Sequence, residues 1–233
     1  MYALTAHTHR LGHAVAQLLD AGLTVEAVPT VRAAFEAAIT ASWICQVPDA
    51  MPAFLNANHR QQKAMRDTVM RAGWLSGDGH IHADTLTPFL VSPKSKTGAN
   101  QVQTLCQDFV AGDAMYSTYR GLSWMTHPTA ATTDLYLRMR PGSPHPTLAT
   151  SPTYSIDEMM PWLHVMCSSL VWSARALNLI DHKRAQSADR RRIRAAAKRL
   201  GIHEFLVVTP AAVDRGRKAE RQRVAAELRR QPE

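Results

Sequence analysis

The chain has 233 residues, which is enough for one sizeable domain or for one domain with an extension. Apolar residues make up 45% of the sequence and charged residues 20%, which is the composition of an ordinary globular protein. The three cysteines stand far apart and form no CxxC pair, which argues against a disulfide framework and against a zinc site. We therefore expect no metal, and no sequence feature calls for a cofactor.

The net charge of +8 comes from the C-terminal end of the chain. Residues 181–233 contain 15 Lys and Arg against seven Asp and Glu, whereas residues 1–180 contain 12 of each sign. This division predicts a neutral helical bundle domain over residues 1–182 and a basic helical extension over residues 183–233.

The N-terminal segment, MYALTAHTHRLGHAVAQLLDAG, lacks the charged-then-apolar order of a signal peptide. No run of 18 apolar residues occurs, so a membrane span is not expected. These observations predict a cytoplasmic protein without a membrane partner.

Helical periodicity dominates the first third of the chain. Residues 3–21 carry apolar side chains at helical spacing, and Gly22 after them is a good C-terminal stop. Residues 25–47 predict a second helix that is apolar nearly all round, which indicates a central buried helix. Residues 49–74 predict a third, more polar helix with Asp49 as its cap.

The middle of the chain alternates between loops and helices. Residues 76–99 are dense in Gly, Pro, Ser and Asp and predict a long loop. The pair His80 and His82 in this loop is a lone His-x-His, which is more often unliganded than bound to a metal. A helical pattern resumes over residues 100–127, with a break expected near Gly112.

A Pro-rich connection over residues 138–155 leads to a second apolar helix over residues 156–180. Ser155 and Glu158 occupy the positions of a capping box at the start of this helix. A basic helix that ends near residue 200 and a charged terminal helix complete the chain. Alternating strand patterns are almost absent, so the sequence predicts an all-α fold, a helical bundle with a basic C-terminal extension.

The stretch YSTYRGLSWMTHPT, residues 116–129, places four polar side chains on one helix face. Steps of four, three and four residues separate them, and these steps bring side chains together on a helix: Tyr116, Arg120, Ser123 and His127. A catalytic site, a ligand-binding site and a hydrogen-bonded seam inside the core would all produce this pattern.

Arg32 and Glu36 stand one turn apart inside the apolar second helix. If this face is buried, each charge needs a partner, because an unpaired buried charge costs on the order of 3–5 kcal/mol. The pair is either a structural clamp or part of a pocket that it shares with the face of Tyr116 and His127. Both interpretations predict that the two helices touch.

The segment VRAAFEAAITASW, followed some eighty residues later by YRGLSWMTHPT, resembles an uncharacterised family of bacterial helical proteins. That family has an R-x-x-x-E element on an early helix and a Y-x-x-L-S-x-x-x-H element on a later one, and the match covers about residues 10–130. Its bundle is similar to the HEPN class. Many HEPN proteins are metal-independent RNases, and several act as toxins or in phage defence.

HEPN nucleases carry an Arg that is followed, after four to six residues, by a His. Arg120 and His127, with six residues between them, fit this spacing. The polar residue that often follows the arginine is Gly121 here. Four Arg–His pairs in the chain have a permitted spacing, and this pair is distinguished by its helical setting beside Tyr116 and Ser123.

The resemblance implies RNA cleavage without a metal, with His127 as general base and Arg120 as phosphate clamp. A neutral imidazole can accept the proton of a ribose 2′-OH, and a guanidinium holds a phosphate through two parallel hydrogen bonds. Tyr116 would donate a further hydrogen bond. Because one helix supplies one Arg–His set, a homodimer that pairs two sets across a cleft is expected.

The basic extension contains a dense cluster of cations on one short helix: Arg190, Arg191, Arg192, Arg194, Lys198 and Arg199. Such a cluster neutralises phosphates without reading sequence, which predicts a nucleic-acid partner. The resemblance to the HEPN class implies RNA in preference to DNA. A solvated tail or a helix that binds a protein partner would have the same composition.

Two functions of different classes therefore stand open. The first is a metal-independent endoribonuclease of HEPN type, acting as a toxin or in defence. The second is a non-catalytic helical module that binds nucleic acid or another partner through the basic extension, while its polar helix face packs in the core.

Overall fold

The computed structural model of the chain describes residues 1–74, 88–139, 141–142, 144–149, 151–152, 154–180 and 188–229. Ten helices and one two-stranded antiparallel sheet occur within these ranges. The prediction of an all-α helical bundle is confirmed. The domain boundary expected at residue 182, and the pair His80 and His82, lie outside the described residues.

The helices form two compact units, each built from distant parts of the chain. The first unit combines Met1–Ser42 with Val110–Val207, and the second combines Trp43–Phe109 with Val208–Glu233. The basic C-terminal segment therefore contributes to both units.

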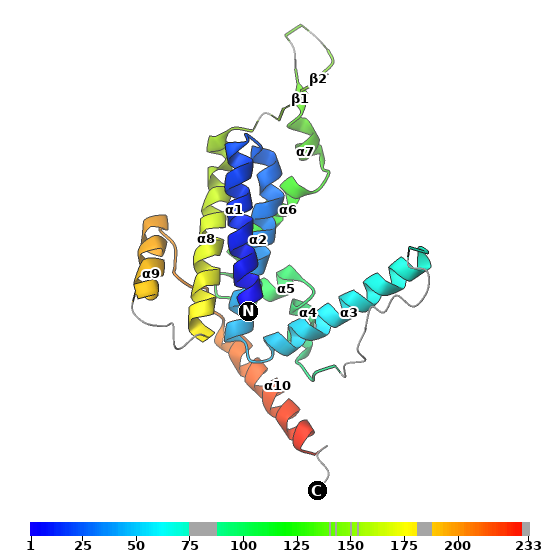
Figure 1. The fold of residues 1–233 in the computed structure, drawn as a ribbon, viewed down its shortest axis with the longest axis vertical. Helices are drawn as coiled ribbons and strands as arrows, with labels where there is room; N and C mark the ends of the chain where they lie inside the picture. The colour runs from blue at the N-terminus through cyan, green and yellow to red at the C-terminus, as the bar shows by residue number, and fades with distance from the viewer. Residues whose placement is uncertain are drawn as a thin grey trace. The chain divides into compact units, whose positions relative to one another are not determined.

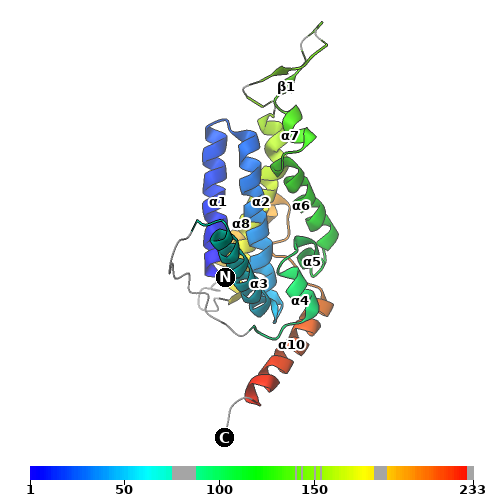
Figure 2. The same ribbon diagram turned by 90° about the vertical axis from the view of Figure 1, so that its right-hand side faces the viewer.

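The first unit is a bundle in which α1, α2 and α8 lie side by side (Figures 1 and 2). Its elements, in chain order, are α1 (Tyr2–Asp20), most of α2 (Thr24–Gln46), α6 (Gly112–Thr126), α7 (Ala130–Asp134), β1 (Leu137–Arg138), β2 (Thr147–Leu148), α8 (Ile156–Ile180) and α9 (Ala188–Leu200). The short β1–β2 pair, with Leu137 opposite Leu148, lies in the region that the sequence predicts as an irregular connection.

The turn between α1 and α2 is set by Gly22, as predicted. This residue has φ of +75°, a left-handed conformation that glycine adopts without strain. The amide of Gly22 donates to the carbonyl of Leu19 at 2.9 Å, and that of Leu23 to the carbonyl of Leu18 at 2.8 Å. These two bonds satisfy carbonyls at the end of α1 and reverse the chain direction.

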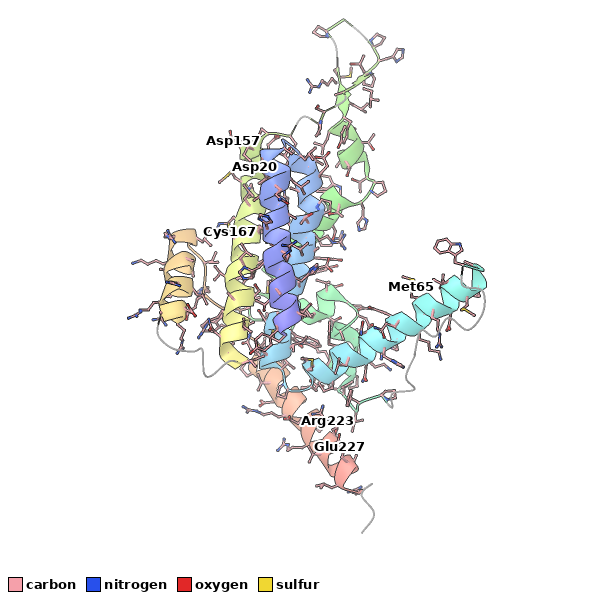
Figure 3. All side chains as sticks on the ribbon, viewed as in Figure 1. Asp20, Met65, Asp157, Cys167, Arg223 and Glu227 are labelled. Atoms are coloured by element: carbon pink, nitrogen blue, oxygen red, sulfur yellow. The ribbon has the colours of Figure 1, made fainter. Side chains whose placement is uncertain are left out.

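Helix α8 runs antiparallel to α1. The Thr5 hydroxyl donates to the Ser173 carbonyl at 3.2 Å, and Gly12 lies against Leu170. Asp20, at the end of α1, and Asp157, at the start of α8, consequently lie at the same end of the pair (Figure 3). Gly12 allows this close packing, because a Cβ there would lie 3.1 Å from Leu170.

Helix α2 is the central buried helix of the first unit, as its all-round apolar pattern predicts. Val28, Val31, Ala34 and Ala38 have no exposed surface. Phe35, 1% exposed, meets the ring of Trp172 on α8 edge-on, with centroids 6.4 Å apart. Burial of this face drives the packing of the bundle.

The predicted capping box begins α8. The Glu158 carboxylate accepts from the Ser155 amide at 2.6 Å, and the Glu158 amide donates to the Ser155 hydroxyl at 3.2 Å. Hydrogen bonds to its carboxylate from the backbone and the side chain of Ser155 lower the pKa of Glu158. By length and composition alone, α8 is long and apolar enough to cross a membrane, and it is the one such helix in the described part of the chain. It packs against α1 and α9, and a helix in the core of a protein can have the same length and composition.

The second unit contains the end of α2 together with α3 (Ala50–Arg71), α4 (Pro93–Gly98), α5 (Val102–Cys106) and α10 (Pro210–Leu228). Helix α4 corrects the prediction of a continuous loop over residues 76–99. Ser92 caps this helix by accepting from the Ser95 amide at 3.3 Å, and Pro93 stands at its first position.

Asp49 also departs from its predicted role. It precedes α3, but its side chain makes no capping bond to that helix. Instead, the buried carboxylate accepts from the Ser92 amide at 2.9 Å and from the Ser95 hydroxyl at 2.8 Å. The prediction of a local cap was wrong because a partner 43 residues away in sequence offers the same hydrogen bonds inside the core.

A second buried carboxylate, Asp108, joins three elements of this unit. Asp108 is 1% exposed and accepts from the indole of Trp43 at 2.9 Å and from the guanidinium of Arg215 at 2.6 Å. The ammonium of Lys94 lies 3.1 Å from its other oxygen. Helix α10 is therefore an integral part of the second unit, attached through Arg215.

Asp108→Asn is expected to lower the free energy of unfolding by about 2 kcal/mol, because it leaves two cations without their shared counter-charge. Urea denaturation followed by circular dichroism measures this loss. Asp214→Asn is the matched control, because the Asp214 side chain is 76% exposed and its ion pair with Arg217 spans 4.0 Å. The control should change stability by less than about 0.5 kcal/mol, and equal effects of the two variants would contradict the role of Asp108.

Candidate functional site

The polar face predicted on residues 116–127 lies on α6. The helix begins at Gly112, next to the predicted break, and ends at Thr126. His127 is the first residue beyond it, with extended backbone at φ −87° and ψ 154°, which corrects its expected place inside the helix. Its amide still donates to the Ser123 carbonyl at 3.1 Å, so the residue continues the helical path.

Three of the four predicted residues line one pocket of about 560 Å³. Arg120 and His127 are exposed, and Ser123 is half-buried. The pocket is completed by Gly121, Trp124 and Thr129. Tyr116 is half-buried outside this lining, where it stacks on Tyr119 with ring centroids 6.1 Å apart.

The pair Arg32 and Glu36 faces α6, as both interpretations of it predict. Arg32 donates through Nε to the Glu36 carboxylate at 2.9 Å. Its Nη1 lies 3.1 Å from Nε2 of His127, and its Nη2 donates to the Tyr119 hydroxyl at 3.0 Å. The Arg32 guanidinium also lies 5.0 Å from the centroid of the Tyr119 ring. One side chain thus ties α2 to both the middle and the end of α6.

This contact determines the state of the His127 ring. A guanidinium carries only donors, so the hydrogen bond to Arg32 requires an unprotonated Nε2 on His127. The ring proton of the neutral imidazole then resides on Nδ1. His127 therefore presents an N–H donor at Nδ1, while the lone pair of Nε2 is occupied by Arg32.

The Ser123 hydroxyl is a buried polar group of this pocket. Its oxygen is buried, and no hydrogen-bond partner is found for it among the described residues. An unsatisfied buried hydroxyl costs about 1–3 kcal/mol.

Gly121, which departs from the HEPN pattern, has a packing role. A Cβ atom at this position would lie 2.9 Å from Cη2 of Trp162 on α8. The Trp162 indole donates to the Tyr154 hydroxyl at 2.7 Å, and this bond orients its ring. Close approach of α8 to α6 therefore excludes a larger residue after Arg120.

Sequence reasoning missed two residues of the site, Tyr119 and Trp124. Tyr119 begins the Y-x-x-L-S-x-x-x-H element, so its position was available as a signal. Trp124 follows Arg120 by one helical turn and precedes His127 by three residues, which is the spacing of a shared face. Neither residue falls on the series of steps of four, three and four residues that defines the predicted polar face.

The six cations predicted to bind nucleic acid all lie on α9, and all are exposed: Arg190, Arg191, Arg192, Arg194, Lys198 and Arg199. Arg192 pairs with Asp189 at 3.7 Å, and Arg194 with Glu204 at 3.4 Å. The helix packs on α8 through Ala197, which is 3% exposed.

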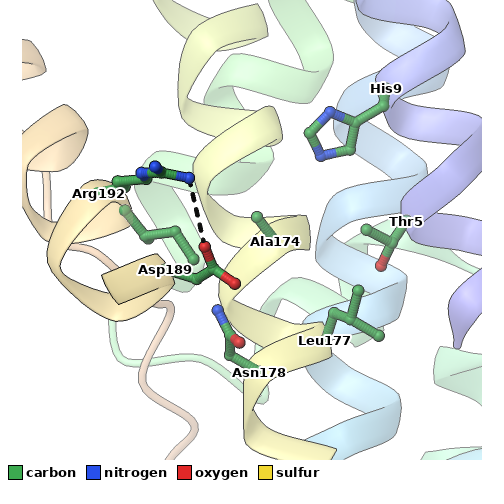
Figure 4. A pocket seen from close by; sticks show the side chains of 8 residues that line it. Thr5, His9, Ala174, Leu177, Asn178, Asp189 and Arg192 are labelled. Atoms are coloured by element: carbon green, nitrogen blue, oxygen red, sulfur yellow. Dashed lines mark ion pairs between the residues drawn. The ribbon is translucent and has the colours of Figure 1, made fainter. Parts of the chain in front are cut away.

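A second pocket of about 270 Å³ lies between α1, α8 and α9 (Figure 4). Its wall includes Thr5, His9, Leu177 and the ion pair of Asp189 with Arg192. Apart from Arg192, none of the residues predicted from sequence to form a site lines it.

No group of three or more His, Cys, Asp or Glu side chains suited to a metal occurs in the described ranges. Cysteine chemistry is also disfavoured at Cys106, because burial raises the pKa of its thiol to about 12. This side chain therefore remains a protonated, inaccessible thiol at neutral pH.

The pocket residues on α6 and the arginine on α2 fall within a region shared with other proteins. Residues 1–144 match the model of a family described as "Family of unknown function (DUF5677)", and the chain belongs to this family. No curated protein and no solved structure matches the chain significantly.

The tautomer of His127 provides a direct test of the Arg32 contact. At a pH where imidazoles are neutral, the ring ¹⁵N chemical shifts of His127 should show a proton on Nδ1 and none on Nε2. Arg32→Met removes the donor and should yield a mixture of both tautomers. The exposed His13 on α1 should keep its shifts in this variant. A tautomer mixture at His127 in the parent protein would refute the contact.

Proposed function

We propose that the chain is a metal-independent endoribonuclease of HEPN type that acts in the cytoplasm at the pocket formed by Arg120, Ser123 and His127. The observation that supports this proposal best is that an exposed guanidinium and an exposed imidazole line one open pocket. The spacing of Arg120 and His127, which fits the Arg–His pattern of HEPN nucleases, supports the same reaction. The toxin or defence role belongs to this proposal as well.

His127 acts as the general base once RNA enters. In the free protein, Arg32 occupies Nε2 of His127. A phosphate is a stronger acceptor for a guanidinium than a neutral imidazole, because the bond is charge-assisted and forms two parallel contacts. The phosphate therefore draws Arg32 away from His127, joins Arg32 to Arg120 as a clamp, and frees Nε2 to accept a proton.

The reaction then proceeds without a metal. Nε2 of His127 takes the proton of the ribose 2′-OH, the 2′-oxygen forms a bond to phosphorus, and the bond from phosphorus to the 5′-oxygen breaks. The products are a 2′,3′-cyclic phosphate and a 5′-hydroxyl end. The leaving 5′-oxygen takes its proton from water or from the imidazolium of a second subunit, which a homodimer would supply. The two guanidinium groups oppose the negative charge that develops on the phosphate oxygens.

His127→Ala is expected to reduce cleavage of unstructured oligoribonucleotides in EDTA by at least about 100-fold, because the general base is lost. The melting temperature should stay nearly unchanged, since the side chain is exposed. Cleavage is measured by gel electrophoresis of end-labelled RNA, with the cyclic phosphate identified by mass spectrometry.

His13→Ala, at another exposed histidine, is the matched control and should retain full cleavage. Two results would overturn the proposal: a parent protein that cleaves no RNA under these conditions, or a His127→Ala protein that cleaves at the parent rate.

A second function, non-catalytic binding of nucleic acid, is favoured by a separate observation. The six cations on α9 are all exposed on one short helix. Phosphate neutralisation by such a surface gives affinity that depends steeply on salt and little on sequence. This binding either accompanies the nuclease activity or replaces it.

The α9 surface is tested by a fourfold change of Arg190, Arg191, Lys198 and Arg199 to Gln. The slope of log affinity against log salt for single-stranded RNA should become shallower by about 0.7 for each phosphate that the variant no longer neutralises. The control removes the same charge from exposed positions on α10 and just after it, with Arg217, Lys218, Arg221 and Arg229 changed to Gln. Point substitutions are required here, because truncation would remove Arg215 from Asp108. Equal slopes in both variants would assign the effect to net charge alone.

A further inference from the structure

The pocket on α6 carries an aromatic residue that neither the general base nor the phosphate clamp explains. Trp124 is 60% exposed, although an indole is among the side chains that gain most from burial. It lines the same pocket as Arg120 and His127. An exposed tryptophan beside a cation is a common arrangement in sites that bind a planar, charged ligand.

The indole lies close to both of the charged or ionisable groups. Trp124 follows Arg120 by four residues, so these two side chains project from one side of α6. His127 is the first residue beyond the helix and lines the same pocket. Along the helix axis, Arg120 and Trp124 are about 6 Å apart at roughly 1.5 Å per residue. A flat apolar surface therefore lies within one nucleotide of the groups that would hold a phosphate.

We propose that Trp124 stacks on an unpaired base next to the phosphate held by Arg120, so that the ligand of this pocket is single-stranded RNA. Every base has a π-face, and stacking on an aromatic side chain is a recurrent way to bind single strands. The bases of an RNA duplex are already stacked, and its deep, narrow major groove is closed to side chains. The stacking assignment depends on the proposed function only for the cleavage step, because binding is measured without cleavage.

The surroundings of Trp124 favour a nucleotide over a protein partner. Its neighbours in the pocket include a guanidinium and an imidazole, which offer hydrogen bonds to an anion. The pocket is open, so these groups and the indole face water, whereas a tryptophan at the centre of a protein contact is shielded from water by the residues around it.

The first experiment measures binding of a fully 2′-O-methylated oligonucleotide, which cannot be cleaved through its 2′-oxygen, by fluorescence anisotropy. Trp124→Ala should weaken binding of the single strand by about 5- to 150-fold, and Trp124→Phe should retain most of the affinity. Trp74→Ala is the matched control, since Trp74 is 81% exposed and lies in the other unit. The same oligonucleotide annealed to its complement should bind the parent and Trp124→Ala proteins equally.

The second measurement follows cleavage of unmodified RNA by the same variants. Trp124→Ala should raise KM with a smaller effect on kcat, because the stacked base contributes to binding in the ground state and the transition state alike. Unchanged melting temperatures of the Trp124 variants would show that the effects come from the ligand contact.

The outcomes separate this inference from the proposed nuclease. Cleavage by the parent protein with an unchanged KM in Trp124→Ala overturns the stacking role and leaves the nuclease standing. Binding that depends on Trp124, without cleavage of any RNA, supports the stacking role and overturns the nuclease. Unchanged oligonucleotide affinity in Trp124→Ala, together with a loss of self-association in sedimentation, would overturn the inference and assign Trp124 to a contact between two copies of the chain.

Discussion

The candidate site depends on the hydrogen bonds that the Arg32 guanidinium makes. The guanidinium is a donor-only group with a planar fork, and three acceptors surround it: Glu36 on its own helix, and Tyr119 and His127 from α6 and its C-terminal end. Glu36 holds the Nε side of the fork, so the two outer nitrogens reach across to α6. This arrangement fixes the register of the two helices and holds the His127 ring at the pocket.

The same contact engages a ring nitrogen of His127. In the free protein, the most basic atom of the His127 ring is engaged by Arg32, and the Ser123 hydroxyl has no partner among the described residues. Both interpretations of the Arg32 and Glu36 pair, clamp and pocket, predicted that α2 and α6 touch, and the structure contains this contact.

In the second unit, buried carboxylates hold distant parts of the chain together. Asp49 and Asp108 are almost inaccessible, and each accepts hydrogen bonds from elements far away in sequence. A charge in the core is tolerated only with such partners, which makes each carboxylate a strong constraint on which helices assemble. Through Arg215, this constraint includes α10. Gly216, next to it, permits the approach, because a Cβ there would lie 2.7 Å from Cδ of Pro48.

The sequence by itself determined the helical class and many local signals. The stop at Gly22, the break before α6 and the capping box of Ser155 with Glu158 all follow from interactions within a few residues, and the structure contains each of them. The apolar pattern likewise identified α2 as the buried helix. Part of the site was predictable for the same reason, since the spacing of Arg120 and Ser123 is a local property of α6, and His127 directly follows that helix.

Tertiary structure alone decided which partners the polar side chains choose. Arg32 contacts His127, which lies 95 residues away in sequence. Asp49 accepts a hydrogen bond from Ser92 and does not cap the helix that follows it. Gly121 leaves room for Trp162 on another helix. Trp124 could be assigned to the site only from the structure, because the exposure of its ring is not visible in the sequence. Periodicity reports which face of a helix a residue occupies, but burial and pairing depend on what packs against that face. The free energy of a buried polar group is set by this second element, which no local pattern encodes.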